Sequence, residues 1–135
     1  MRPTSLAVVP LALAALLPGC LVVAAAAVAA GVVHVTSEDT VEVYFNNPYD
    51  KVFDAAEQEL VARGGAPMTD RKTGKIEASL GHSSVSIQVT GTGDKSTRIE
   101  VKARKNQGIS PDIDRANQIA TGVSKRVGVS DGTTK

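Results

Sequence analysis

Residues 6–33 form an apolar run without a charged side chain, and this run decides how much of the chain can fold into a compact domain. It is longer than the roughly 20 residues that a helix needs to cross a bilayer, so it belongs to an export signal or a membrane anchor. A compact domain commonly holds roughly 100 to 150 residues, which leaves room for one domain after the run. Much of the 42% hydrophobic content lies in the run, and aromatic residues are only 3% of the chain. The sequence therefore predicts one small domain with a modest core.

The beginning of the chain has the parts of an export leader. Arg2 supplies a short positive region, residues 6–17 supply an apolar region, and Gly19 is the small residue expected before a cleavage site. The sequence Leu17-Pro18-Gly19-Cys20 resembles the lipobox of bacterial lipoproteins, although Pro18 stands where Ala or Ser is commoner. The resemblance implies that the Cys20 sulfur takes a diacylglycerol, that the leader is cut before Cys20, and that the new amino terminus is often acylated.

Acyl chains on Cys20 would hold the protein on a bilayer without a transmembrane helix. Each buried methylene contributes roughly 0.8 kcal/mol, and two or more chains give stable anchoring. Leu21 stands where an Asp retains lipoproteins in the inner membrane of enteric bacteria, so the periplasmic face of the outer membrane is favoured in a Gram-negative host. Cys20 is the only cysteine, so the chain cannot form an intramolecular disulfide.

A second interpretation keeps residues 6–33 as an uncleaved spanning anchor. Pro18 and Gly19 weaken it because both are poor helix residues, although membrane helices tolerate them. On the favoured interpretation the chain divides into a signal peptide at 1–19, an Ala- and Val-rich tether at 20–31, an α+β domain at 32–129 and a polar tail at 130–135.

Five segments show the alternation of apolar and polar residues that is typical of strands with one buried face. The first two, residues 32–36 and 41–45, flank the polar residues 37–40 and predict a hairpin. The other three predict an antiparallel meander, because turns containing glycine separate them. Their apolar positions are Ile76, Ala78 and Leu80, then Val85, Ile87 and Val89, then Ile99, Val101 and Ala103.

Two segments show the apolar spacing of amphipathic helices. The first is predicted to begin at Asn47-Pro48-Tyr49-Asp50, with Asn47 as the cap and Pro48 in the first helical position, and to end at Gly64-Gly65. The second is predicted to have the same capped start at Ser110-Pro111-Asp112. The apolar stripes are Val52, Phe53, Ala56 and Leu60 in the first helix, and Ile113, Ala116, Ala120, Val123 and Val127 in the second.

The order of hairpin, helix, meander and helix predicts an α+β fold. We expect an antiparallel sheet of four to five strands with both helices packed on one face, because each element has a single apolar side. From lipobox to final helix, the chain resembles a family of small bacterial lipoproteins whose shared domain has no assigned function. The resemblance rests on "NNPYDKVFDAAEQEL", "TGKIEA", "VSIQV" and "TRIEVKA", and it brings no catalytic residues with it.

The residues that could perform acid, base or nucleophilic chemistry do not form a motif. His34 stands in a strand and His82 in a turn, and neither has the spacing of a zinc site. Ser83-Ser84 adjoins His82, but neighbours on a strand point to opposite faces, and no Gly-x-Ser-x-Gly sequence is present. We therefore expect no metal site and no nucleophilic centre.

Two further patterns have ordinary explanations. Residues 91–96, "GTGDKS", lack the Gly-Lys pair of a phosphate-binding loop and are better explained as a hairpin turn. Glu57 and Glu59, like Asp112 and Asp114, lie two residues apart and so do not share a helix face. These carboxylates are expected on solvated helix surfaces. The sequence predicts a non-enzymatic protein without a cofactor.

Basic residues gather on the outward side of the last predicted strand. The chain has 15 basic and 14 acidic residues, and this balance argues against a nucleic-acid-binding protein. A basic patch there would meet anionic headgroups or an acidic partner. The same residues can simply prevent edge pairing and keep the sheet soluble, and we favour that role. The patch would comprise Arg98, Lys102, Arg104 and Lys105, with Arg71, Lys72 and Lys75 nearby.

The sequence thus predicts a cell-envelope lipoprotein that binds or supports a partner and does not catalyse a reaction. Its expected partners are the bilayer, through acylated Cys20, and an unidentified envelope protein. Two alternatives stay open. One is a signal-anchored accessory subunit that docks on an envelope complex or transporter, and the other, less favoured, is a small hydrolase that uses His82 and Ser83 or Ser84.

Overall fold

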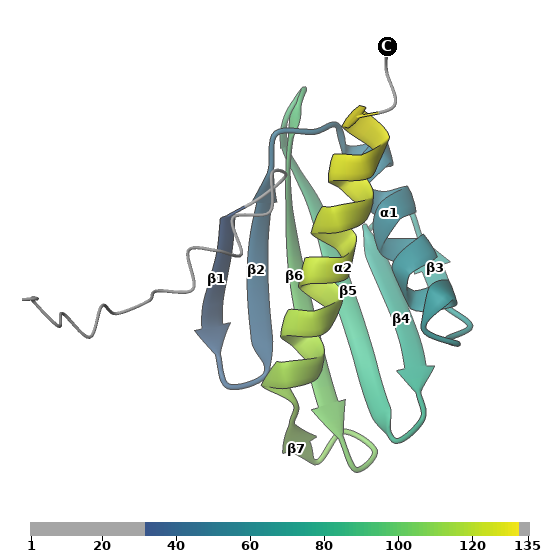
Figure 1. The fold of residues 1–135 in the computed structure, drawn as a ribbon. Helices are drawn as coiled ribbons and strands as arrows, with labels where there is room; N and C mark the ends of the chain where they lie inside the picture. Colours follow the sequence, from purple (N-terminus) through teal and green to yellow (C-terminus); the bar gives the residue numbers. More distant parts are fainter. Residues whose placement is uncertain (1–31, 133–135) are drawn as a thin grey trace, which may run out of the picture.

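The computed structural model describes residues 32–132, in which two helices cover one face of an antiparallel sheet (Figure 1). The predicted α+β fold is confirmed. The lipobox, the tether and residues 133–135 lie outside the described residues. The elements are β1 (Val32–Ser37), β2 (Thr40–Phe45), α1 (Tyr49–Ala62), β3 (Met68–Asp70), β4 (Lys75–Leu80), β5 (Ser83–Gly93), β6 (Ser96–Lys105), β7 (Ser110–Pro111) and α2 (Ile113–Gly132).

The sheet is wider than the four to five strands predicted. Its order is β1-β2-β6-β5-β4-β3, and β7 pairs with the end of β6. The hairpin of β1 and β2 and the meander of β4, β5 and β6 are confirmed. The two additional strands, β3 and β7, have three and two residues, and alternation cannot be recognised in segments so short. β6 joins the hairpin to the meander, because it pairs with both β2 and β5.

The core lies between the sheet and the helices, and the alternating residues of β2, β4, β5 and β6 face it. Burial of each large side chain there contributes roughly 1.5–3 kcal/mol. The apolar side of β1 differs from this pattern, since Val35 is 60% exposed at the sheet edge, while α2 packs on β2 and β6. The largest fully buried side chains include Phe45, Phe53, Leu60, Ile76, Ile87, Ile99 and Ile119.

Both helix starts differ in detail from the prediction. Pro48, not Asn47, is the N-cap of α1, and the Asn47 carbonyl accepts a hydrogen bond from Thr97 Oγ1 in β6 (2.8 Å). Ser110 and Pro111 form β7 and do not begin a helix, because they pair with Lys105 and Arg104 in β6. The cap of α2 is Asp112, whose Oδ1 accepts from the backbone N–H of Arg115 (3.3 Å). In both cases the residue predicted as the helix cap instead forms a hydrogen bond or a strand pair with β6.

α1 ends at a glycine stop, as predicted, whereas α2 continues beyond its predicted end. After α1, Gly64 adopts a φ of +86°, and the Gly65 N–H donates to the Leu60 carbonyl (2.9 Å), as expected for a glycine stop. α2 continues to Gly132 and so includes the first part of the segment predicted as a polar tail. Across residues 32–132, neither helix combines the length and apolar character needed to cross a bilayer.

Candidate functional site

Arg98, Lys102 and Arg104 of the predicted patch share the open face of the sheet, but carboxylates lie beside them. Lys105, at the exposed end of β6, belongs instead to the alternate series of positions that contains the buried Ala103. Arg98 is 3.8 Å from Glu42 on β2 and 3.8 Å from Glu100 on its own strand. Oδ2 of Asp39 lies 3.1 Å from Nη1 of Arg104 and 3.5 Å from Nζ of Lys102. The open face is therefore a network of mixed charges, and such pairs suit a solvated sheet surface more than an anion-binding patch.

Asp39 organises one end of this network from the turn between β1 and β2. Its Oδ1 accepts hydrogen bonds from the Thr40 hydroxyl (2.8 Å) and the Ser37 hydroxyl (3.0 Å). Thr40, then Ser37 and the two cations of β6 lower the pKa of Asp39 below its ordinary value, against the opposing effect of burial. A carboxylate so held contributes stability to the folded state only while it is ionised.

This arrangement predicts acid sensitivity that depends on Asp39. Because folding lowers the pKa, the stabilisation is fully present above the ordinary value of 3.8 and is lost as the pH falls through the lower folded value. Asp39→Asn should therefore reduce the loss of stability between about pH 5 and about pH 2, measured by urea unfolding of the full chain. Asp94→Asn, at the exposed β5–β6 turn, is the control. Identical pH profiles for Asp39→Asn and the wild type would contradict the assignment.

In the second group of predicted basic residues, Arg71 and Lys75 are also paired. Arg71 donates to Asp50 (3.0 Å) and Asp54 (2.6 Å) on α1, and its guanidinium lies 4.2 Å from the centre of the Phe53 ring. The Arg71 carbonyl accepts from the Tyr49 hydroxyl (2.8 Å). These contacts attach the turn between β3 and β4 to the first part of α1. Lys75, at the start of β4, lies 2.9 Å from Glu77.

The residues considered for catalysis are not assembled into one site. Ser83 donates to Asp112 Oδ2 (3.1 Å), so this hydroxyl does meet a carboxylate. His82 is exposed in the β4–β5 turn, and no hydrogen bond joins it to Ser83 or Asp112 in the described part of the chain. His34 lies at the opposite edge, with its ring centre 6.2 Å from that of Tyr44. Residues 32–132 contain no group of three His, Cys, Asp or Glu side chains placed to hold a metal ion.

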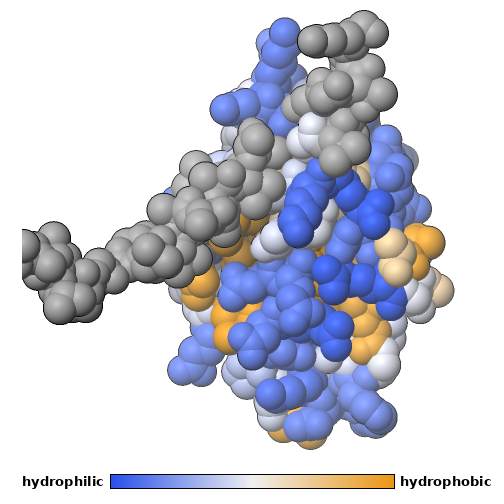
Figure 2. Space-filling model, viewed as in Figure 1, coloured by the Kyte–Doolittle hydropathy of each residue, from blue (hydrophilic) through white to orange (hydrophobic). Residues whose placement is uncertain are grey.

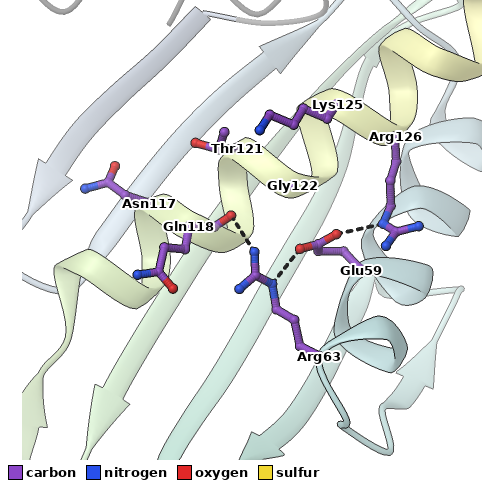
Figure 3. Close-up of a pocket in the computed structure, with 8 residues that line it drawn as sticks. All are labelled: Glu59, Arg63, Asn117, Gln118, Thr121, Gly122, Lys125 and Arg126. Atoms are coloured by element: carbon purple, nitrogen blue, oxygen red, sulfur yellow. Dashed lines mark hydrogen bonds and ion pairs between the residues drawn. The ribbon is translucent and has the colours of Figure 1, made fainter.

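The most strongly organised polar group lies between the two helices (Figure 3). Glu59 of α1 is 6% exposed, and its carboxylate oxygens accept from Nε of Arg63 and from Nε of Arg126 on α2 (2.5 and 2.7 Å). Arg63 Nη2 also donates to the Gln118 carbonyl (3.0 Å), which ties α1 to α2 a second time. The expectation that Glu59 lies on a solvated surface is wrong, because packing of the helices encloses it.

Gly122 makes this enclosure possible. A Cβ atom at position 122 would overlap Glu59 Oε1, so the carboxylate occupies the space that a side chain would fill. A groove of about 670 Å³ lies beside Gly122, lined by residues of α2 and of the last turn of α1. In Figure 3, Thr121 and Lys125 lie on one side of Gly122, and Glu59, Arg63 and Arg126 lie on the other. The remaining lining residues are Asn117 and Gln118.

No family model and no curated protein matches this chain. The groove over Gly122 must therefore be judged on its own geometry. Its lining combines three cations and one carboxylate with two amides and a hydroxyl, which suits a polar, negatively charged ligand.

Part of this site has a recognisable sequence signal. Glu59 follows Ala56 by three residues and precedes Leu60, so it falls on the apolar stripe of α1, where a charged residue needs a partner. Arg63 stands four residues later, at the spacing of an ion pair within one helix. Arg126 is 67 residues from Glu59, and only the packing of α2 on α1 identifies it as the second partner.

Proposed function

We propose that the chain is a lipid-anchored protein of the bacterial cell envelope that acts by binding or structural support and not by catalysis. The observation that carries the proposal is Leu17-Pro18-Gly19-Cys20 at the end of an apolar leader. The first strand begins at Val32, twelve residues beyond Cys20, and such a tether reaches at most about 40 Å. An anchor at Cys20 would therefore keep the α+β domain close to the membrane surface, and in a Gram-negative host the periplasmic face of the outer membrane is the favoured location.

The hydrogen bonds and ion pairs of the carboxylates of Glu59 and Asp39 support a binding role over a catalytic one. Both oxygens of Glu59 are held by arginine Nε groups, and Asp39 accepts from two hydroxyls while it pairs with two cations. A general acid or base must be free to exchange a proton with a substrate. These carboxylates are committed to contacts that hold elements together.

The anchor is tested by comparing the full chain with Cys20→Ser after expression in a bacterial host. The wild type should begin at Cys20, carry the added mass of acyl chains and fractionate with membranes. Cys20→Ser should keep its leader and show no acyl mass, because the thioether cannot form. Intact mass spectrometry and membrane fractionation measure both results, and Cys20→Ala provides a second variant without a thiol.

The opposite outcome has a definite meaning. If wild type and Cys20→Ser both keep Met1 and remain equally membrane-bound, the lipobox interpretation fails. Residues 6–33 would then act as a spanning anchor, and the accessory-subunit alternative would replace the lipoprotein proposal.

A further inference from the structure

We propose that the groove over Gly122 binds a phosphate group carried as a dianionic monoester, with Arg63 and Lys125 as its main cationic contacts. The proposal concerns a ligand of the folded domain and does not depend on acylation of Cys20. It rests on the charge of the groove, the donors that remain available in it, and its size.

The groove keeps an excess of positive charge after its internal ion pairs are counted. Its lining contains Arg63, Lys125 and Arg126 against the single carboxylate of Glu59. Assigning the charge of Glu59 to Arg126 leaves Arg63 and Lys125, a net charge of +2. On the open face of the sheet, by contrast, Arg98, Lys102 and Arg104 lie beside carboxylates. Among the side chains that line the groove, positive charge therefore exceeds negative charge.

The donors of the groove are already positioned. Nε of Arg63 is held by Glu59 and its Nη2 by the Gln118 carbonyl, so the guanidinium is fixed in place while Nη1 makes no bond to another described residue. Lys125 is exposed on the next turn of α2, and it forms no ion pair with a carboxylate of residues 33–128. The Thr121 hydroxyl lies on the same side of Gly122 as Lys125 (Figure 3). A guanidinium, an ammonium and a hydroxyl thus line the same groove, in which the arginine-held carboxylate of Glu59 lies against Gly122.

A phosphate monoester fits this set better than a carboxylate. A monoester carries a charge of about −1.5 to −2 at pH 7 and offers three acceptor oxygens, whereas a carboxylate carries one charge and two oxygens. Only the monoester can balance both cations and also accept from the hydroxyl or an amide.

The size and surroundings of the groove agree with a small polar ligand. Its volume of about 670 Å³ lies within the range of roughly 300–1,000 Å³ that is usual for small-molecule sites. Figure 2 shows hydrophilic residues over most of the described helix-bearing side, where an apolar partner would find little contact area. A free phosphate ester and a lipid headgroup that ends in a phosphate monoester share the chemistry required.

The test is a calorimetric titration of the full chain in detergent with inorganic phosphate at constant ionic strength. We expect binding that saturates in the millimolar range. Lys125→Gln should weaken it about tenfold, the effect of losing one charge-assisted hydrogen bond. Lys105→Gln removes an exposed lysine of β6 outside the groove, and it should bind phosphate as the wild type does. Circular dichroism confirms that both variants keep the wild-type fold.

A second arm identifies the source of the phosphate. The chain is placed in phosphatidylcholine vesicles with or without phosphatidic acid, and free phosphate is titrated again. If phosphatidic acid weakens the apparent affinity for free phosphate, the groove takes a lipid headgroup, and if it has no effect, the groove takes a soluble ester. Absence of saturable binding, or equal affinities of Lys125→Gln and Lys105→Gln, would overturn the proposal, because general attraction to positive charge does not depend on one lysine.

Discussion

The double variant Arg63→Met, Arg126→Met is expected to unfold with a free energy about 3–5 kcal/mol below that of the wild type. Methionine retains most of the apolar stem of each arginine, so the loss comes mainly from the carboxylate of Glu59. That carboxylate is 6% exposed and would be left between the helices without either partner. Urea unfolding of the full chain at pH 7 measures the change.

The control adds Glu59→Gln to the same double variant. The amide has nearly the shape of the carboxylate but carries no charge, so the triple variant should regain a large part of the lost stability. Equal stabilities of the double and triple variants would show that the loss arises from packing of the arginine stems and not from the enclosed charge.

Gly74→Ala is expected to lower the free energy of unfolding by about 3 kcal/mol. Gly74 has a φ of +76°, and a left-handed conformation costs an alanine about 1–2 kcal/mol. In addition, the new Cβ would overlap the carbonyl oxygen of Val89, and overpacking of this kind costs about 1–3 kcal/mol. The contact cannot relax easily, because the Val89 N–H donates to the Gly74 carbonyl (2.8 Å) and β5 is paired on both sides.

Gly81→Ala separates the two contributions to this effect. Gly81 also has a positive φ, of +64°, but a Cβ added there would have no other atom within 4 Å. Alanine at this position should cost only the conformational term of about 1–2 kcal/mol. If the two alanine variants unfold at the same urea concentration, the close approach of Gly74 to Val89 has no energetic weight.

The sequence by itself was sufficient for the elements with strong periodicity. The alternation in β2, β4, β5 and β6 predicts their buried sides, because a strand places successive side chains on opposite faces whatever surrounds it. The stripe of Val52, Phe53, Ala56 and Leu60 predicts α1 for the corresponding reason in a helix. These patterns are local. They identify the apolar face of each strand or helix, and the tertiary structure then determines which other element packs against that face.

Features that depend on contacts distant in the chain were decided by the tertiary structure. Local spacing favours Ser110 as a helix cap, but pairing with Lys105 makes it part of β7. The spacing of Arg98, Lys102 and Arg104 also predicts a basic patch. The pairing of β2 with β6 brings Glu42 and Asp39 beside these cations, so the patch becomes a network of mixed charges.

The groove over Gly122 combines both kinds of information. Glu59 falls on the apolar stripe of α1 with Arg63 one turn later, a signal of an enclosed ion pair that the expectation of a solvated Glu59 overlooked. Only the packing of α2 against α1 brings Arg126 to the second carboxylate oxygen of Glu59. The same packing places that carboxylate in the space beside Gly122 that a side chain would otherwise fill. Sequence periodicity fixes which side of an element is buried, whereas the identity of the neighbour on that side is settled only when distant elements pack together.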